Sequence, residues 1–351
     1  TTLLFFILGK KISLKERLII MEELNYNKIS GVIALAKYVI SLTFFIELIG
    51  AFLLFLYFQN ILSFRKAVFF SFFHCISAFN NAGFDLFGNS LENFVISPYI
   101  NIVIPLLIII GGLGFVVIEE IYYKRKLRKL SLHSKLVVYM TISLILIGTL
   151  SVFILEYNNP ETIGDLSLFG KLMASFFQGV TPRTAGFNTI GIGSLHDVTL
   201  FIIIILMFIG ASPGSTGGGV KTTTIGTLFA VVYNMAVGKE DIEIAKRRLK
   251  EKDIYKALSV VVISLILIIV VTFVLIFTED FTFIQVFFEV FSAFATVGLS
   301  TGITPELSIL GRIFIIITMF IGRVGPFTLA MALGRRYNKR IRYPEEDILI
   351  G

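Results

Sequence analysis

Long apolar stretches alternate with shorter apolar segments and basic loops along this chain. Six stretches are long enough to cross a bilayer, which takes about 20 apolar residues; they are residues 31–58, 97–121, 136–156, 197–236, 257–278 and 307–333. Between successive pairs lie three shorter segments that are too polar to cross, at 64–88, 167–187 and 282–300. A short apolar segment between two spans is typical of a re-entrant helix. The pattern predicts an all-α polytopic membrane protein in which a unit of helix, re-entrant helix and helix occurs three times.

The composition excludes the soluble classes of protein. Of the 351 residues, 56% are hydrophobic and only 16% are charged, and the mean hydropathy is +0.87. Soluble domains have a smaller apolar share and a larger charged share than this chain. The lone Cys75 excludes a disulfide scaffold. A lipid bilayer is therefore the expected environment of the protein.

Most basic residues lie in four clusters, and these predict the topology. The net charge is +7, and residues 10–28, 124–135, 239–256 and 335–342 hold 23 of the 31 Lys and Arg residues. Short basic loops stay on the cytoplasmic side of a membrane, so all four clusters are expected there, with two crossings between successive clusters. Nucleic-acid binding is the weaker interpretation, because the clusters lack interleaved aromatic residues and adjoin the spans.

One glycine recurs at the same place in all three shorter segments. Gly83, Gly186 and Gly298 each follow a small apolar residue and precede a large one, within NNAGF at 80–84, RTAGF at 183–187 and TVGLS at 296–300. The run before each glycine is helix-like and rich in aromatic residues. An internal repeat of this kind indicates pseudosymmetry around an axis. Ordinary loops that end at a glycine are the alternative interpretation.

These glycines would allow backbone carbonyl groups to face a cation. Non-helical backbone is tolerated at membrane depth only where it is buried in protein or lines water. Glycine readily reaches the backbone angles that turn successive carbonyls to one side, and rings of carbonyls can replace the hydration shell of a cation. The units are therefore expected to surround a central pore. Asp85, Glu92 and Asp197 either attract cations to its mouth or are ordinary solvated loop charges.

Five segments resemble signatures of the Trk/Ktr/HKT superfamily of potassium transporters, and most closely those of the membrane (KtrB-type) subunit of bacterial Ktr systems. They are SAFNNAGFDL at 77–86, TPRTAGFNTI at 181–190, GASPGSTGGGVK at 210–221, SAFATVGLSTG at 292–302 and GRVGPFTL at 322–329. The resemblance implies four units around one pore, each with a filter glycine, and uptake of K⁺ across the cytoplasmic membrane of a bacterial cell. Transport of Na⁺ or another monovalent cation by the same fold is the alternative.

The resemblance also assigns the selectivity filters and the repeats. The filter residues are Asn80, Asn81, Ala82, Gly83, Phe84, Thr184, Ala185, Gly186, Phe187, Thr296, Val297, Gly298 and Leu299. The end of the first repeat and a loop are expected at 1–30, the second repeat at 31–123, the third at 124–238, the fourth at 239–334 and a cytoplasmic tail at 335–351. Because no segment matches the filter of a first repeat, we expect the chain to be a fragment of a longer protein.

A glycine-rich segment interrupts the apolar stretch 197–236. Its five glycines and one proline cannot continue a helix, so two half-helices joined by a polar loop are expected. A phosphate-binding loop is disfavoured, because Val220 separates Gly219 from Lys221 and no strand precedes the segment. The resemblance places this loop under the filter as a gate, formed by Gly210, Ser212, Gly214, Ser215, Thr216, Gly217, Gly218, Gly219 and Lys221.

Arg323 lies within an apolar helix and joins the candidate gate. A charged side chain in the middle of a span costs about 2.5–3.5 kcal/mol, so Arg323 must face protein or water. One interpretation is a structural arginine that caps carbonyls of a neighbouring helix. The other, which the resemblance favours, is a positive barrier below the filter.

Neither an enzyme nor a resident cofactor is expected. His74, His133 and His196 are scattered without Cys or Glu at ligand spacing, and no nucleophile has a plausible base. The resemblance makes K⁺ the transported ion and leaves open a coupling or activating role for Na⁺. It also implies a homodimer in the lipid bilayer and a cytoplasmic ring of nucleotide-binding regulatory subunits of the KtrA or TrkA type.

Overall fold

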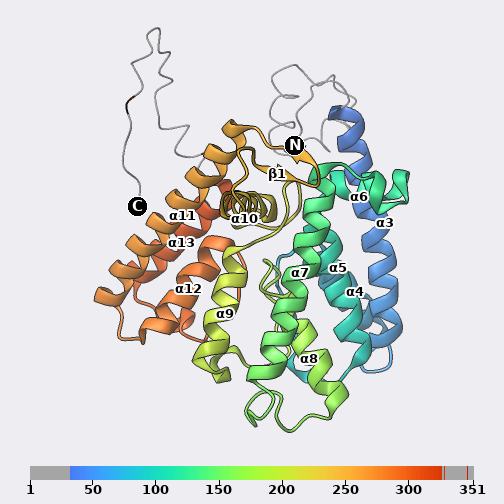
Figure 1. Ribbon diagram of the computed structural model, residues 1–351. Helices are drawn as coiled ribbons and strands as arrows, with labels where there is room; N and C mark the ends of the chain where they lie inside the picture. Colours follow the sequence, from blue (N-terminus) through green and yellow to red (C-terminus); the bar gives the residue numbers. More distant parts are fainter. Residues whose placement is uncertain (1–31, 326–327, 329–345, 347–351) are drawn as a thin grey trace.

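The computed structural model describes residues 32–325, 328 and 346, and three long helices recur along this part of the chain (Figure 1). They are α3 (Val32–Phe58), α7 (Leu132–Leu155) and α11 (Glu251–Thr278). Each is long and apolar enough to cross a membrane. The predictions for 1–30 and nearly all of 335–351, including the first and last basic clusters, lie outside the described residues.

A short apolar helix follows each long one. These helices are α4 (Phe64–Phe79), α8 (Leu168–Val180) and α12 (Phe283–Ala295). Their 16, 13 and 13 residues give lengths of about 20–24 Å, which is less than the hydrocarbon thickness of about 30 Å. Ser167 starts α8 by accepting a hydrogen bond from the Gly170 N–H at 3.2 Å. The short helices therefore enter the fold without crossing it, as the predicted fold class requires.

An inner helix completes each unit. The inner helices are α5 (Pro98–Leu113) with α6 (Phe115–Lys124), α9 (Asp197–Phe208) with α10 (Thr222–Ala236), and α13 (Ile309–Val324). Short elements join them: the 3₁₀ turns Glu92–Phe94, Leu127–Lys129, Ile192–Ser194 and Thr304–Glu306, and an antiparallel pair of strands, β1 (Glu243–Ile244) and β2 (Arg247–Arg248).

Successive units pack against one another in the same way. The inner helix α5 contacts the short helix α8 of the next unit, and α9 likewise contacts α12. Phe177 and Phe294 are fully buried on α8 and α12 within the resulting apolar cores. The short helices are thus held between outer and inner helices, and this packing fixes where their carboxyl ends point.

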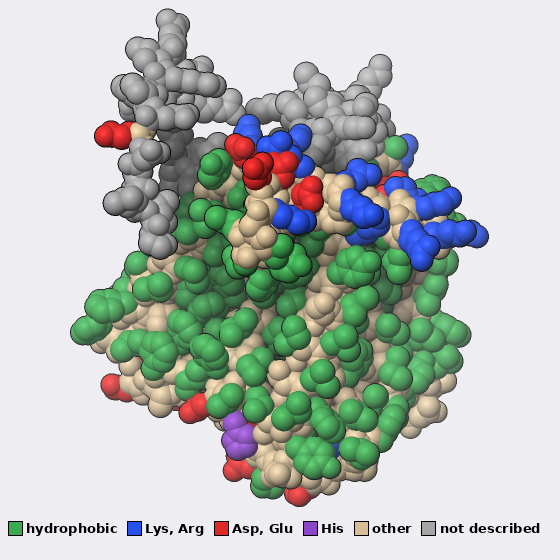
Figure 2. Space-filling view, viewed as in Figure 1, with side chains coloured by type: hydrophobic (Ala, Val, Ile, Leu, Met, Phe, Trp, Pro, Cys, Tyr) green, Lys and Arg blue, Asp and Glu red, His purple; other side chains and the backbone are tan. Residues whose placement is uncertain are grey.

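The molecular surface has the layers expected of a membrane protein. In the view of Figure 2, hydrophobic side chains cover the middle of the molecule. Lys and Arg gather at one end together with several acidic side chains, and a few acidic side chains and a His lie at the other. The clusters at 124–135 and 239–256 both lie at the basic end, which we call the basic face. Exposed side chains such as Phe44, Phe52 and Phe273 on the outer helices are 60–71% accessible and suit contact with lipid.

The inner helix of the first unit, which is the predicted second repeat, differs from its sequence prediction. One span was expected over 97–121, but the chain bends by 97° between α5 and α6. The bend lies at Gly114, whose φ of 93° and ψ of 134° are readily reached only by glycine. A side chain there would also press on the Pro213 carbonyl oxygen, 2.6 Å from a Cβ placed on Gly114. Contact with the glycine-rich segment therefore accompanies the bend.

Candidate functional site

The three repeated glycines, far apart in the sequence, meet inside the fold. A Cβ placed on Gly83 would lie 2.6 Å from the Ala185 carbonyl oxygen, and one on Gly186 would overlap the Val297 carbonyl oxygen. A Cβ on Gly298 would lie 3.8 Å from the Gly186 Cα. The strands that carry these glycines are therefore in direct backbone contact. We call them the glycine strands, at residues 80–84, 183–187 and 296–300.

Each glycine strand has the same backbone twist. The glycines have φ values of 72°, 79° and 90°, and the residues two positions earlier, Asn81, Thr184 and Thr296, also have positive φ values of 52°, 68° and 53°. Left-handed angles are costly for residues other than glycine, so their recurrence at one offset in three strands shows a shared local structure. Such angles reorient successive carbonyls relative to an ordinary extended strand.

Hydrogen bonds brace the first two strands from behind. The Ser77 hydroxyl donates to the Phe84 carbonyl oxygen at 2.8 Å, and the Thr181 hydroxyl donates to the Phe187 carbonyl oxygen. The amide of Asn80 donates to the Glu47 carboxylate at 2.8 Å. The two hydroxyls hold the carbonyls that directly follow Gly83 and Gly186, and Glu47 on α3 anchors the first strand to the outer helix.

The side chains of the strands differ more than their backbones. Phe187 and Leu299 are buried, whereas Phe84 at the equivalent position is 68% exposed. Ala185 and Val297 are buried, whereas Ala82 is exposed. The three strands thus share their backbone conformation, while the burial of their side chains differs.

The carboxyl ends of the short helices point toward the glycine strands. Helix α4 ends at Phe79, α8 at Val180 and α12 at Ala295, each three to six residues before its glycine. A helix carries about half a negative charge at its carboxyl end. The place where the glycine strands meet is therefore electrostatically suited to a cation.

The glycine-rich segment folds into a compact loop between α9 and α10. Residues 209–221 are non-helical, and a parallel bridge pairs Ile209 with Val220. The Gly210 N–H donates to the Val220 carbonyl oxygen at 2.9 Å, and the Ser212 and Thr222 hydroxyls are hydrogen-bonded at 2.9 Å. We call this segment the glycine loop.

Three consecutive residues of the glycine loop each meet one glycine strand. The Thr216 hydroxyl donates to the Asn81 side-chain oxygen at 3.2 Å. A Cβ placed on Gly217 would overlap the Thr184 hydroxyl, and one placed on Gly218 would overlap the Thr296 hydroxyl. The strand residues contacted are the three non-glycine residues with positive φ. The glycine loop therefore lies directly against all three strands, and only glycine fits at two of the contact points.

Two cationic side chains hold the loop in this place. Arg323 of α13 donates to the Thr216 carbonyl oxygen at 2.7 Å, and Lys221 donates to the Gly217 carbonyl oxygen at 2.8 Å. Both line a cavity of about 980 Å³ that also borders Asp253 and Lys256 near the start of α11. The cavity lies between the loop and the basic face. Arg323 thus binds a carbonyl of the glycine loop and not one of a neighbouring helix, and its positive charge lies beside the loop.

The elbow between α5 and α6 supports the loop from the other side. The N–H groups of Ser212 and Thr216 donate to the carbonyl oxygens of Gly112 and Gly111 at 3.1 and 3.2 Å, and the Phe115 N–H donates to the Gly214 carbonyl oxygen at 3.0 Å. Sequence reasoning missed this support, although the glycines at 111, 112 and 114 mark a place where backbones can approach closely.

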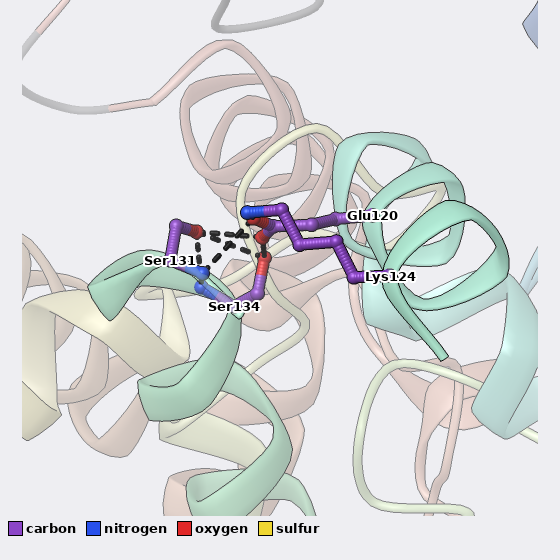
Figure 3. A network of polar contacts seen from close by, with 4 residues as sticks. All are labelled: Glu120, Lys124, Ser131 and Ser134. Carbon is purple, nitrogen blue, oxygen red and sulfur yellow. Dashed lines mark hydrogen bonds and ion pairs between the residues drawn. The ribbon is translucent and has the colours of Figure 1, made fainter. Parts of the chain in front are cut away.

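A polar network fixes α6 to the start of α7 (Figure 3). The Glu120 carboxylate accepts hydrogen bonds from the Ser131 N–H at 2.9 Å and the Ser131 hydroxyl at 2.7 Å, and it also contacts Lys124 and Ser134. Burial alone would raise the pKa of Glu120, but hydrogen bonds from Lys124, Ser134 and Ser131 outweigh burial and hold this pKa below its ordinary value. The carboxylate thus stays charged at neutral pH, and the elbow is anchored at both ends.

No group of three or more His, Cys, Asp or Glu residues that could hold a metal ion occurs in the described part of the chain. His74 and His196 lie in different parts of the fold, on α4 and before α9. The polar atoms that converge on the glycine strands are instead mainly backbone carbonyls and hydroxyls.

Comparison with known proteins agrees with this architecture. Residues 3–337 match the family model TrkH, described as a cation transport protein. The chain is 44% identical over 349 residues to the Ktr system potassium uptake protein B of Bacillus subtilis (strain 168), covering 99% of this chain and 78% of that protein. It is 39% identical over 356 residues to the potassium/sodium uptake protein NtpJ of Enterococcus hirae, covering 99% and 79%.

A solved structure shares the fold. The crystal structure of the potassium transporter TrkH from Vibrio parahaemolyticus matches with a TM-score of 0.74 at 18% sequence identity, over 92% of this chain and 69% of that chain. The resemblance that five sequence segments suggested is confirmed by the family match and by this fold. The chain therefore belongs to the TrkH family of cation transport proteins.

Proposed function

We propose that this chain forms the ion pathway of a potassium uptake protein, in which K⁺ passes between the glycine strands. The observation that carries the proposal is the convergence of Gly83, Gly186 and Gly298, each on a strand with the same backbone twist. Carbonyls arranged around a passage can replace the hydration shell of a cation, and the negative ends of three short helices favour its charge. Relatives named for potassium uptake support K⁺ as the ion.

The filter in this proposal consists of the residues assigned from the sequence, at 80–84, 184–187 and 296–299. The predicted repeat boundaries are retained with it, because 31–123, 124–238 and 239–334 each contain one outer helix, one short helix, one glycine strand and one inner helix. A shared backbone conformation suits this role, since backbone carbonyls would coordinate the ion in each unit.

The glycine loop and Arg323 act as the gate in this proposal. The loop contacts all three strands at adjacent residues, so it blocks the path between the strands and the cavity on the basic side. The positive charge of the Arg323 guanidinium would repel K⁺ beside the loop. Movement of the loop away from Asn81, Thr184 and Thr296 would open the path.

Transport of sodium is the second candidate function, because one relative is named a potassium/sodium uptake protein. Uptake of ⁸⁶Rb⁺ and ²²Na⁺ into vesicles containing the full-length protein separates the two. The potassium proposal expects saturable ⁸⁶Rb⁺ uptake that excess K⁺ suppresses and excess Na⁺ leaves largely intact. Equal suppression by both ions would favour the second candidate, and an absence of uptake of either ion would contradict both.

The basic face indicates how the protein is oriented in the membrane and which surface binds partner proteins. Because clusters of Lys and Arg are retained in the cytoplasm, the clusters at 124–135 and 239–256 are proposed to face it, in the bacterial cell membrane. This face would then dock a ring of nucleotide-binding regulatory subunits, and two copies of the membrane subunit would pair as a homodimer. The names of relatives as parts of a Ktr system support a multi-component assembly.

Cysteine labelling tests this orientation. Arg248 on β2 has a side chain that is 64% exposed, and the native Cys75 is buried, so an Arg248→Cys variant offers one accessible thiol. We expect a membrane-impermeant maleimide to leave intact cells unlabelled at this position and to react after permeabilisation. Glu161→Cys, on the exposed loop after the opposite end of α7, should react from outside. The reverse pattern would invert the topology.

A further inference from the structure

Each of the three short helices carries a buried polar side chain, which lies nine residues before the glycine in α4 and α12 and eight residues before it in α8. His74 on α4, Gln178 on α8 and Glu289 on α12 are 0%, 0% and 5% exposed. Each stands three residues before a hydroxyl residue, namely Ser77, Thr181 and Ser292. The three residues differ in chemistry, so the shared feature is their place behind the glycine strands.

Each of these side chains reaches the chain segment that follows its glycine. The Nδ1–H of His74 donates to the Phe70 carbonyl oxygen at 2.7 Å, which leaves Nε2 to accept from the Leu86 N–H at 3.3 Å. Gln178 donates to the Ile190 carbonyl oxygen at 3.5 Å. Glu289 accepts a hydrogen bond from the Thr304 hydroxyl, which is also 2.9 Å from the Ser300 hydroxyl. All three therefore tie a short helix to the chain two to four residues beyond the end of a glycine strand.

The fourth-repeat strand depends most on this tie. Ser77 and Thr181 brace the carbonyls that follow Gly83 and Gly186, but Ser292 forms no equivalent side-chain hydrogen bond among the described residues. The carbonyls that follow Gly298 therefore lack a side-chain hydrogen bond that the equivalent carbonyls after Gly83 and Gly186 have.

Burial of the Glu289 carboxylate costs free energy, so its presence in this core needs a functional reason. Its second carboxyl oxygen, Oε2, is buried without a hydrogen-bond partner among the described residues. Phe288, Val290 and Phe291 beside it are buried apolar residues, so a leucine of similar size would suit this core better. A buried polar group with an unsatisfied atom calls for an explanation of this kind.

We propose that Glu289 is a positioning residue for ion selectivity, which fixes the Ser300–Thr304 segment through Thr304 and thereby sets the carbonyls around Gly298. The inference rests on the proposed function, because it assumes that the glycine strands form the filter. It deepens that function by naming a side chain that does not touch the ion yet determines discrimination. Gln178 and His74 have the same role in their own units.

Ratios of ⁸⁶Rb⁺ to ²²Na⁺ uptake in vesicles containing the full-length protein test the inference. Glu289→Gln keeps an oxygen that can accept from Thr304, so its ratio should stay within about twofold of wild type. Glu289→Leu removes the acceptor, and its ratio should fall roughly tenfold. Thr304→Val removes the donor from the other side without altering α12, and should lower the ratio similarly even if Glu289→Leu fails to fold.

Glu279→Leu is the matched control. Glu279 is also a buried carboxylate that binds a hydroxyl and an N–H, those of Ser308 before α13, but it lies away from the glycine strands. This variant should lower the melting temperature and leave the ratio unchanged. A loss of stability by itself would reduce both uptakes equally, so the ratio separates positioning from folding.

Three outcomes would overturn the inference. A wild-type ratio in both Glu289→Leu and Thr304→Val would show that the tie does not set selectivity. Equal losses in Glu289→Gln and Glu289→Leu would show that the charge matters and not the accepted hydrogen bond. Absence of a preference for ⁸⁶Rb⁺ over ²²Na⁺ in the wild-type protein would contradict both the proposed function and this inference. The first two outcomes would contradict the inference alone.

Discussion

Replacing Gly186 with alanine is expected to abolish discrimination between K⁺ and Na⁺ in the full-length protein. Gly186 has a φ of 79°, and an added methyl group would overlap the Val297 carbonyl oxygen of the neighbouring strand. The left-handed backbone alone costs an L-residue about 1–2 kcal/mol, and the overlap must also displace a carbonyl that the proposal assigns to the filter. Because 1.4 kcal/mol corresponds to a factor of ten, the ⁸⁶Rb⁺ to ²²Na⁺ uptake ratio should fall at least about tenfold.

Gly88→Ala separates the effect on the filter from backbone strain. Gly88 has a similar φ of 88°, but nothing lies within 4 Å of a Cβ placed on it. This control should show the cost of the left-handed backbone in its melting temperature and keep the wild-type uptake ratio. If Gly186→Ala folds and retains the wild-type ratio, the glycine strands do not form the filter.

Removing the side chain of Arg323 is expected to open the gate. Its guanidinium donates to the Thr216 carbonyl oxygen in the part of the loop that contacts the strands. A hydrogen bond from a charged group contributes about 1.5–3 kcal/mol, and the exposure of Arg323 places its contact at the lower end of this range. Arg323→Ala should therefore raise ⁸⁶Rb⁺ uptake by roughly tenfold and reduce its dependence on a regulatory partner. Deletion of 215–218, which removes all three contact residues, should have a larger effect.

Arg312→Ala is the control on the same helix. The Arg312 side chain donates to the carbonyl oxygens of Leu307 and Pro305 at 3.0 and 2.7 Å, at the opposite end of α13 from the loop. Its removal should leave uptake near the wild-type rate. Wild-type uptake and full response to the partner in both Arg323→Ala and the loop deletion would place the gate elsewhere and leave Arg323 a structural role.

Local physical chemistry allowed the sequence to predict the elements of the fold. The apolar stretches at 31–58, 136–156 and 257–278 correspond to α3, α7 and α11, because the length needed to cross a bilayer depends only on nearby residues. The interruption at 210–221 likewise follows from its own glycines and proline, and α9 and α10 end and begin on either side of it. The equivalence of Gly83, Gly186 and Gly298 was visible from their spacing alone.

Contacts between residues distant in the sequence were decided only by the tertiary structure. Thr216 meets Asn81 across 135 positions, and Gly217 and Gly218 meet Thr184 and Thr296. No local pattern marks such partners, because they depend on how three units pack around a common centre.

The elbow at Gly114 and the tie from Glu289 to Thr304 were decided in the same way. The apolar residues from 97 to 121 favour a continuous span, and the bend instead accompanies the close approach of the glycine loop. In the sequence, Glu289 is a polar residue within an aromatic helix and has no obvious partner. It meets Thr304 only because the chain after Gly298 folds back over α12. Hydropathy and backbone propensity are properties of neighbouring residues and fixed the elements, whereas close packing between units determined which polar groups meet.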